Sequence, residues 1–189
     1  MNRRAAGWIL GLALAVLAAG LAWWWLGDSG HRPWRRSPAA ATSSQPREKV
    51  AFDLFFPAEN GMLRGERRDL EVTPSPKDRA RRIIEGLLAG PRQPGLVRPF
   101  PEPVQLGSVQ LVTGGLLYVD LRWPEQADPP GGGSTEEIQR IYSVVDSVTL
   151  NVPEIRGVVL LWNGVQRTTF SGHLDTSLPL AADRELVAR

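Results

Sequence analysis

The hydrophobic pattern of the chain begins with an uninterrupted apolar run over residues 5–26, with arginines on both sides. At 1.5 Å per residue the run makes a helix of roughly 33 Å, which is enough to cross a hydrocarbon core of about 30 Å. Its last turn carries Trp23, Trp24 and Trp25, and indole rings favour the headgroup zone of a bilayer. The pattern therefore predicts a transmembrane anchor over residues 1–27.

A cleavable secretory signal is the alternative for the same residues, because two arginines and the small residues from Ala18 to Ala22 are typical of one. The run exceeds the usual apolar core of about 7–15 residues, which favours an uncleaved signal sequence that stays as the anchor. We expect a cytoplasmic N terminus, with the folded part on the extracytoplasmic side of the cytoplasmic membrane.

Residues 28–49 are rich in proline and arginine and offer almost nothing to bury, so we expect an extended linker there. The hydrophobic patterns of a folded domain follow over residues 50–180. A tail over residues 181–189 completes the predicted organisation.

The domain begins with strict alternation, as a half-buried strand requires, and Pro57 ends it. The alternating apolar residues are Val50, Phe52, Leu54 and Phe56. Residues 58–65 are typical of a turn, and residues 67–72 predict a short edge strand.

A helix is predicted next, because Ser75 suits an N-cap, Pro76 suits the first helical position, and Gly90 ends the pattern. Its buried stripe is spaced i, i+3, i+4, i+7 and i+8. The stripe consists of Ala80, Ile83, Ile84, Leu87 and Leu88.

The second half predicts a hairpin of strands over 104–112 and 116–121, then a helix, then a strand over 158–162 with an Asn163-Gly164 turn. Ser134 and Glu137 have the spacing of a capping box, in which the glutamate bonds back to the cap amide. The expected buried stripe of this helix is Ile138, Ile141, Tyr142, Val145, Val148 and Thr149. Residues 165–170 are expected to pair back after the turn, and the chain from Gly172 onward to be mostly loop.

These patterns predict an α+β fold of the order β-α-β-β-α-β: a small mixed sheet of three to four strands with two helices on one face. The chain contains no cysteine, which excludes disulfides and thiolate metal sites. Residues 1–49 carry a net charge of +5 and residues 50–189 a net charge of −3. The basic charge therefore lies beside the predicted membrane span, and the domain lacks the basic face that nucleic acids require.

Taken together, the order of elements resembles a GerMN domain, the module of sporulation and spore-germination proteins. The resemblance rests on the strand ending Phe55-Phe56-Pro57, the helix ending Leu87-Leu88-Ala89-Gly90-Pro91, the proline-rich link to a hairpin ending Val119-Asp120-Leu121, and the capped helix before Asn163-Gly164. It covers roughly residues 50–180.

This resemblance implies a fold similar to ring-building motifs and a non-enzymatic module of the cell envelope. It also implies assembly roles such as building the complex between the two membranes of a developing spore. The sequence departs from the lipid-anchored members of the family, because it has no cysteine to carry the lipid.

Candidate chemistry is sparse. The glycines at 131–133 precede a helix start, but no lysine follows them and Glu136 and Glu137 occupy the place of a phosphate, so we expect a loop. His173 and Asp175 with Ser171 or Ser177 suggest a partial Ser–His–Asp set, yet no G-x-S-x-G turn is present.

Asp53 and Asp120 are candidates for a paired-carboxylate site on neighbouring strands, although the solvent face of the predicted sheet is the favoured position for both. Phe55 and Tyr118 are expected beside them, which makes a mixed patch suited to protein contact. Arg79, Arg81 and Arg82 on the first helix would offer a basic counterpart for head-to-tail packing, but a solvated face stabilised by Asp78–Arg82 spacing is the favoured interpretation.

The sequence thus predicts no catalytic, cofactor-binding or metal-binding residues and no cofactor. The expected partners are the membrane, through the N-terminal helix, and envelope proteins, including self-association, but no nucleic acid. A peptidoglycan-associated accessory or a periplasmic hydrolase that uses His173 or the carboxylates is the alternative function.

Overall fold

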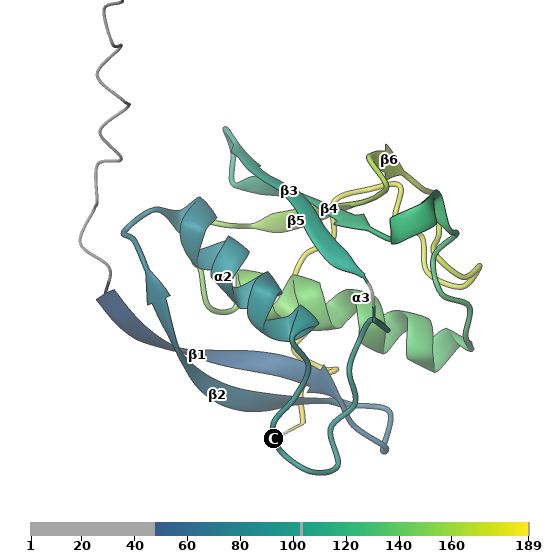
Figure 1. The fold of residues 1–189 in the computed structure, drawn as a ribbon, viewed down its shortest axis with the longest axis horizontal. Helices are drawn as coiled ribbons and strands as arrows, with labels where there is room; N and C mark the ends of the chain where they lie inside the picture. The colour runs from purple at the N-terminus through teal and green to yellow at the C-terminus, as the bar shows by residue number, and fades with distance from the viewer. Residues whose placement is uncertain (1–47, 103, 189) are drawn as a thin grey trace, which may run out of the picture. The chain divides into compact units, whose positions relative to one another are not determined.

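Residues 48–102 and 104–188 are described in the computed structural model of the protein (Figure 1). The predicted anchor over 1–27 and nearly all of the predicted linker over 28–49 lie outside these residues. Within the described part of the chain, no helix is both long enough and apolar enough to cross a membrane.

The first two strands form an antiparallel hairpin that pairs without a register shift along its whole length. β1 covers Glu48–Pro57 and β2 covers Leu63–Val72. The predicted alternation is confirmed, since Phe52, Leu54 and Phe56 are all buried. β2 starts earlier than predicted, because residues 63–65, expected in the turn, pair with residues 55–57 of β1.

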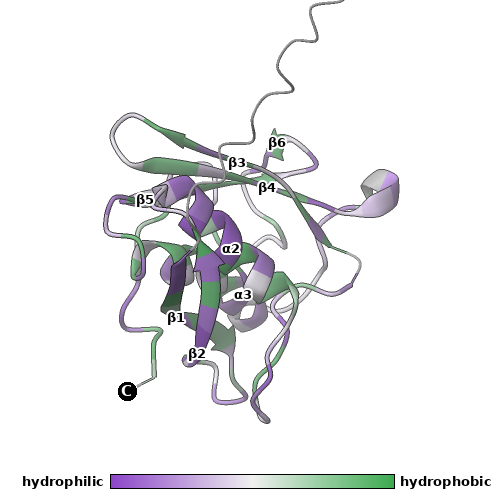
Figure 2. Ribbon diagram, turned by 60° about the vertical axis from the view of Figure 1, so that its left-hand side comes forward, coloured by the Kyte–Doolittle hydropathy of each residue, from purple (hydrophilic) through white to green (hydrophobic). Residues whose placement is uncertain are grey.

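The helix α2 covers Pro76–Leu88 and begins as predicted. Ser75 is the N-cap, and its side-chain oxygen accepts the N–H of Asp78 at 3.4 Å. Gly90 follows the helix with a φ of +86°, a conformation that favours glycine. Figure 2 shows hydrophobic and hydrophilic positions mixed along this helix, whose fully buried residues are Ala80, Ile83, Ile84 and Leu87.

Four further strands form a second sheet in the order β3-β4-β5-β6. They are β3 (Gln105–Val112), β4 (Leu116–Arg122), β5 (Gly157–Trp162) and β6 (Val165–Gln166). β3 and β4 form the predicted hairpin, with a register shift between Leu106 and Val109. β5 runs parallel to β4, and the Asn163-Gly164 turn returns the chain into β6, which is much shorter than predicted.

The helix α3, Ser134–Thr149, connects β4 to β5 and thereby provides the crossover that parallel neighbours need. It is buried on nearly all sides. Ile141, Val145 and Val148 of the predicted stripe are buried, but so are Ser143, Asp146 and Ser147, which the stripe did not include.

The described part of the chain consists of three layers, with α2 and α3 between the two sheets (Figure 1). The prediction of a single sheet with both helices on one face is therefore wrong, although the α+β class is right. Among the described strands β1 pairs only with β2, and both helices pack against this hairpin as well as against the second sheet. Burial of α3 on both sides follows from this middle position.

Polar side chains of α3 cover the edge of β1 that β2 leaves open. The Asn151 side chain just beyond the helix accepts the N–H of Asp53 at 3.0 Å and donates to its carbonyl at 2.8 Å. Ser147 Oγ accepts the N–H of Phe55 at 2.8 Å, and the Gln139 amide donates to the carbonyls of the hairpin turn, Ala58 and Met62. A helix thus satisfies the strand edge in place of a further strand.

The C-terminal segment, residues 180–188, contacts all three layers, whereas a loop and a tail were predicted. Leu180 exchanges backbone hydrogen bonds with Val158 of β5, and Asp183 donates its N–H to Asp146 of α3. Leu63 at the start of β2 bonds to the backbone of residues 186 and 188. The segment therefore links the two sheets across α3.

Candidate functional site

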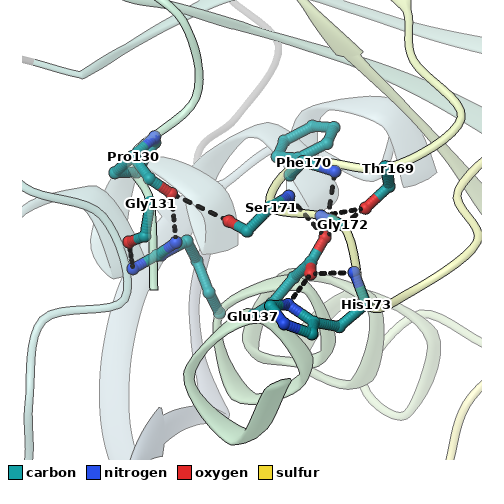
Figure 3. A network of polar contacts seen from close by, with 9 residues as sticks. Pro130, Gly131, Glu137, Thr169, Phe170, Ser171, Gly172 and His173 are labelled. Carbon is teal, nitrogen blue, oxygen red and sulfur yellow. Dashed lines mark hydrogen bonds and ion pairs between the residues drawn. The ribbon is translucent and has the colours of Figure 1, made fainter. Parts of the chain in front are cut away.

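Glu137, in the first turn of α3, is the centre of a network of polar contacts (Figure 3). Its side chain is fully buried. One carboxylate oxygen accepts the N–H groups of Phe170 and Ser171 at 2.9 and 2.7 Å and the hydroxyl of Thr169 at 2.7 Å. The other oxygen accepts the N–H of His173 at 2.8 Å and lies 3.1 Å from its Nδ1. One carboxylate thus holds the loop of residues 169–173.

The network keeps this carboxylate ionised. Burial by itself raises the pKa of Glu137, but the hydrogen bonds from the 169–173 loop outweigh burial and lower the pKa to about 2. At neutral pH the group is an anion whose acceptor capacity is filled by neutral donors and by His173. An acid this strong and this enclosed is a poor proton acceptor for chemistry and a good anchor for a loop.

The predicted capping box is wrong. α3 begins after Gly133, which is the N-cap and has no side chain to bond with, and Ser134 is the first helical residue. Glu137 does not return to the cap amide, because its carboxylate is committed to a loop more than thirty residues away in sequence. The Ser134–Glu137 spacing is that of a capping box, but the Glu137 carboxylate binds the five donors of the 169–173 loop instead of the one nearby cap amide.

The glycine loop before α3 is held by an arginine. Arg140 donates to the carbonyls of Pro99 at 2.9 Å and Pro130 at 2.8 Å, and Ser171 Oγ donates to the same Pro130 carbonyl at 3.0 Å. The side chain of Glu136 lies close to Gly132, within 2.5 Å of where a Cβ would stand. These carbonyls and carboxylates are unsuited to a phosphate.

The structure does not assemble the Ser–His–Asp arrangement, because His173 is paired with neither of the serines nor with Asp175. His173 contacts Glu137, as described, and its side chain is 41% exposed. Ser177 donates its hydroxyl to Asp175 at 2.5 Å, in an exposed local turn. The hydroxyl of Ser171 donates a hydrogen bond to the carbonyl of Pro130. The structure therefore brings His173 to a buried glutamate that the sequence analysis had placed in a capping box.

Asp53 and Asp120 are not neighbours, so the paired-carboxylate site is wrong. Asp53 lies in β1 and faces Arg67 of β2 at 3.7 Å, whereas Asp120 lies in β4 of the other sheet. Asp120 is also buried: its carboxylate accepts the N–H of Gly164 at 2.7 Å and pairs with Arg122 at 2.8 Å. Its role is to fix the turn between β5 and β6 on the neighbouring strand.

The mixed patch predicted for one sheet face is wrong for the same reason. Phe55 is only 9% exposed, because its ring lies over Gly65 and beside a groove lined by the C-terminal Val187 and Ala188. Tyr118 is half-buried on β4, in the other sheet.

The predicted basic face of α2 is partly neutralised within the fold. Arg79 pairs with Glu154 at 2.5 Å and Arg82 with Glu85 at 3.0 Å. The expected Asp78–Arg82 pair is not what stabilises this face, since Asp78 accepts the N–H and hydroxyl of Thr73 instead.

Sequence reasoning missed the buried ion pair of Glu66 and Arg68 in β2 and the buried Asp146 of α3. The Asp146 side chain is inaccessible to solvent; one oxygen accepts the N–H of Asp183 at 2.9 Å and the other has no hydrogen-bond partner in the described part of the chain. Burial first, and then the nearby charge of Asp183, raise its pKa to about 7 against the opposing effects of that hydrogen bond and of Arg184. The available signal was an aspartate in the mostly apolar run Val144-Val145-Asp146-Ser147-Val148.

No group of three or more histidine, cysteine, aspartate or glutamate residues suited to a metal ion occurs within residues 48–102 and 104–188.

Comparison with known proteins gives a consistent result at the level of family and fold. The profile of the Germane family, described as "Sporulation and spore germination", matches residues 53–168, more than half of the chain. Among proteins with curated functions, none matches in sequence.

The solved structures that share the fold include the following three. The first GerMN domain of the sporulation protein GerM from Bacillus subtilis superposes with a TM-score of 0.54 at 18% identity, over 72% of this chain and 98% of that one. The tandem GerMN domains of the same protein give 0.54 at 18% identity, over 71% of this chain but only 46% of theirs. A candidate lipoprotein from Clostridium perfringens gives 0.52 at 19% identity, over 74% and 88%. The chain therefore belongs to the Germane family of sporulation and spore-germination proteins, and its domain has the GerMN fold.

Proposed function

We propose that the protein is a membrane-anchored, extracytoplasmic GerMN module that binds envelope proteins and acts in their assembly, in sporulation or spore germination, without catalysing a reaction. Family membership supports the sporulation and germination setting. The apolar run over residues 5–26 supports the tether, and a structural neighbour described as a candidate lipoprotein supports an envelope setting.

The Glu137 network is the observation that carries the non-catalytic part of the proposal. His173 is the one histidine of the folded part, and its Nδ1 faces a carboxylate that also accepts three backbone N–H groups and a hydroxyl. A general base needs an acceptor that is free to take a proton near neutral pH. Glu137, with its pKa lowered to about 2, is instead a fixed anion that orders a loop.

A periplasmic hydrolase or peptidoglycan-associated accessory is the second candidate. It is favoured by the 41% exposure of the His173 side chain, which leaves that ring open to a ligand.

Location and binding are tested together on the full chain in its native membrane. We expect the protein to fractionate with membranes, to resist extraction at high salt, and to expose residues 50–189 to protease added outside the cytoplasmic membrane. Crosslinking followed by purification should then capture envelope proteins. Recovery of the full-length chain from the cytosol would refute the proposed location, and capture of cytosolic proteins alone would refute the binding role.

A further inference from the structure

The outer edge of β2 carries a row of unpaired backbone groups. Every second residue of β2 bonds to β1, and the residues between them point their N–H and C=O groups to the other side. Leu63 shows the direction, because its N–H and C=O bond to the C-terminal segment. By the same alternation, Gly65, Arg67, Asp69 and Glu71 point outward, and no backbone partner for them occurs in the described part of the chain.

Between residues 65 and 71 this edge has neither a bulge nor a covering segment in the described part of the chain, and its protection is charge: Arg67, Asp69 and Glu71 at the outward positions, with Glu66 and Arg68 buried on the inner face. β3, the open edge of the other sheet, is disturbed by a register shift between Leu106 and Val109. β1 is covered by Asn151 and the polar side chains of α3. β2 pairs with β1 without any shift, and residues 65, 67, 69 and 71 are all exposed. A regular, exposed edge is able to accept another strand.

The charges along the edge are self-complementary in one antiparallel register. If a two-fold axis passes beside residue 68, Arg67 of each copy lies opposite Asp69 of the other, and Gly65 lies opposite Glu71. A shift by one step, which is two residues, places Arg67 opposite Arg67 in one direction. In the other direction it places Arg67 opposite Glu71 but also Asp69 opposite Asp69, so only the register centred on residue 68 pairs opposite charges without opposing like ones. Oppositely charged cross-strand pairs stabilise a sheet, and like charges directly opposite one another destabilise it.

We propose that two copies of this chain associate through their β2 edges, antiparallel and centred on residue 68, which joins the two hairpins into one four-stranded sheet. The interface is isologous, with two Arg67–Asp69 pairs related by the two-fold axis. In each free copy, the ion pair that Arg67 makes within residues 48–102 and 104–188 is an exposed contact with Asp53 at 3.7 Å, with side chains 71% and 51% exposed, so it competes weakly. In this proposal the partner in assembly is a second copy of the chain. The argument depends on the edge of β2 and does not require that the domain also binds an envelope protein.

Disulfide trapping in the full chain tests the register. The natural sequence has no cysteine, so every disulfide must come from introduced residues. Two differently tagged full-length copies, one with Arg67→Cys and one with Asp69→Cys, are produced in the same membrane and oxidised. Residues that exchange both backbone bonds have Cα atoms about 5.5 Å apart, which is within disulfide range.

We expect at least tenfold more linked dimer from this pair than from two controls. The first control combines Arg67→Cys with Glu71→Cys, two residues out of register. The second carries Lys77→Cys in both copies, on the exposed start of α2, and reports random collision. Equal linkage in all three pairs, linkage of Arg67→Cys mainly to other proteins, or no linkage at all would overturn the proposal, whether or not envelope proteins are captured elsewhere on the domain.

Charge exchange provides a second measurement that involves no disulfide. Arg67→Asp places acids at both position 67 and position 69, and Asp69→Arg places bases at both, so either variant alone should show at least tenfold less association between tagged copies than the natural chain. Mixing the two variants should restore association, because each acid then faces a base. Failure of the mixture to exceed either variant alone would refute the proposed register.

Discussion

Replacing Asp146 by asparagine should remove most of the dependence of stability on pH near neutrality. The Asp146 carboxyl is buried, and one of its oxygens has no partner among the described residues. Its pKa is about 7 in the folded chain against an ordinary value of 3.8. The folded state therefore holds a proton that the unfolded state releases between these two values, and stability falls as the pH rises through that range.

The magnitude follows from the size of the shift. Each pKa unit corresponds to about 1.4 kcal/mol, so the free energy of unfolding should fall by roughly 4 kcal/mol between pH 4 and pH 7 and then level off, as far as this group is concerned. Asparagine keeps an oxygen for the N–H of Asp183 but does not ionise. Its amide adds a buried donor, whose cost of about 1–3 kcal/mol does not vary with pH.

The assay is urea denaturation of a fragment comprising residues 48–189, with unfolding monitored by tryptophan fluorescence at pH values from 4 to 8. The stability of Asp146→Asn relative to the natural sequence should rise by roughly 4 kcal/mol from pH 4 to pH 7 and then level off. Asp128→Asn is the matched control, because it removes the same charge from a side chain that is 85% exposed. If the Asp146→Asn difference is constant with pH, the assignment of a protonated buried carboxyl is refuted.

Three further predictions concern the structural anchors. Glu137→Gln should lower the stability of the same fragment by about 3 kcal/mol above pH 5, because the pKa of Glu137 lies near 2 instead of its ordinary 4.5. This loss of stability should shrink as the pH falls from 4.5 toward 2. Denaturation curves that show the same loss at pH 2.5 would contradict the prediction. Leu87→Asp should cost several kcal/mol by thermal denaturation, because Leu87 is fully buried on α2, and a silent substitution would show that the helix is misplaced. Asn151→Ala should lower the free energy of unfolding by about 1–3 kcal/mol and speed amide hydrogen exchange at Asp53, whose N–H and C=O lose their partner. Equal exchange rates in the variant and the natural sequence would contradict the role of Asn151 in covering the edge of β1.

The sequence predicted those elements whose causes are local. The cap at Ser75, the buried stripe of α2 and the stop at Gly90 all depend on residues within one or two turns, and the structure confirms each. The hairpin of β3 and β4 and the Asn163-Gly164 turn were predictable for the same reason.

What the sequence did not predict depends on distant partners. Alternation in β1 showed which face is buried, but not that a helix would cover its edge through Ser147 and Asn151. Glu137 satisfied a local capping rule and is used by a loop more than thirty residues later. The conflict between the apolar pattern of α3 and its polar residues was the visible sign of a helix packed between two sheets.

The central claim, that this domain acts by binding while its buried ionisable groups serve the fold, is tested most directly with His173→Ala in the full chain. The variant and the natural protein are crosslinked in the native membrane, the captured envelope proteins are identified, and hydrolysis of peptidoglycan by each purified protein is measured. The account predicts the same captured proteins from both and no turnover from either. Turnover by the natural protein that disappears with His173 would contradict it.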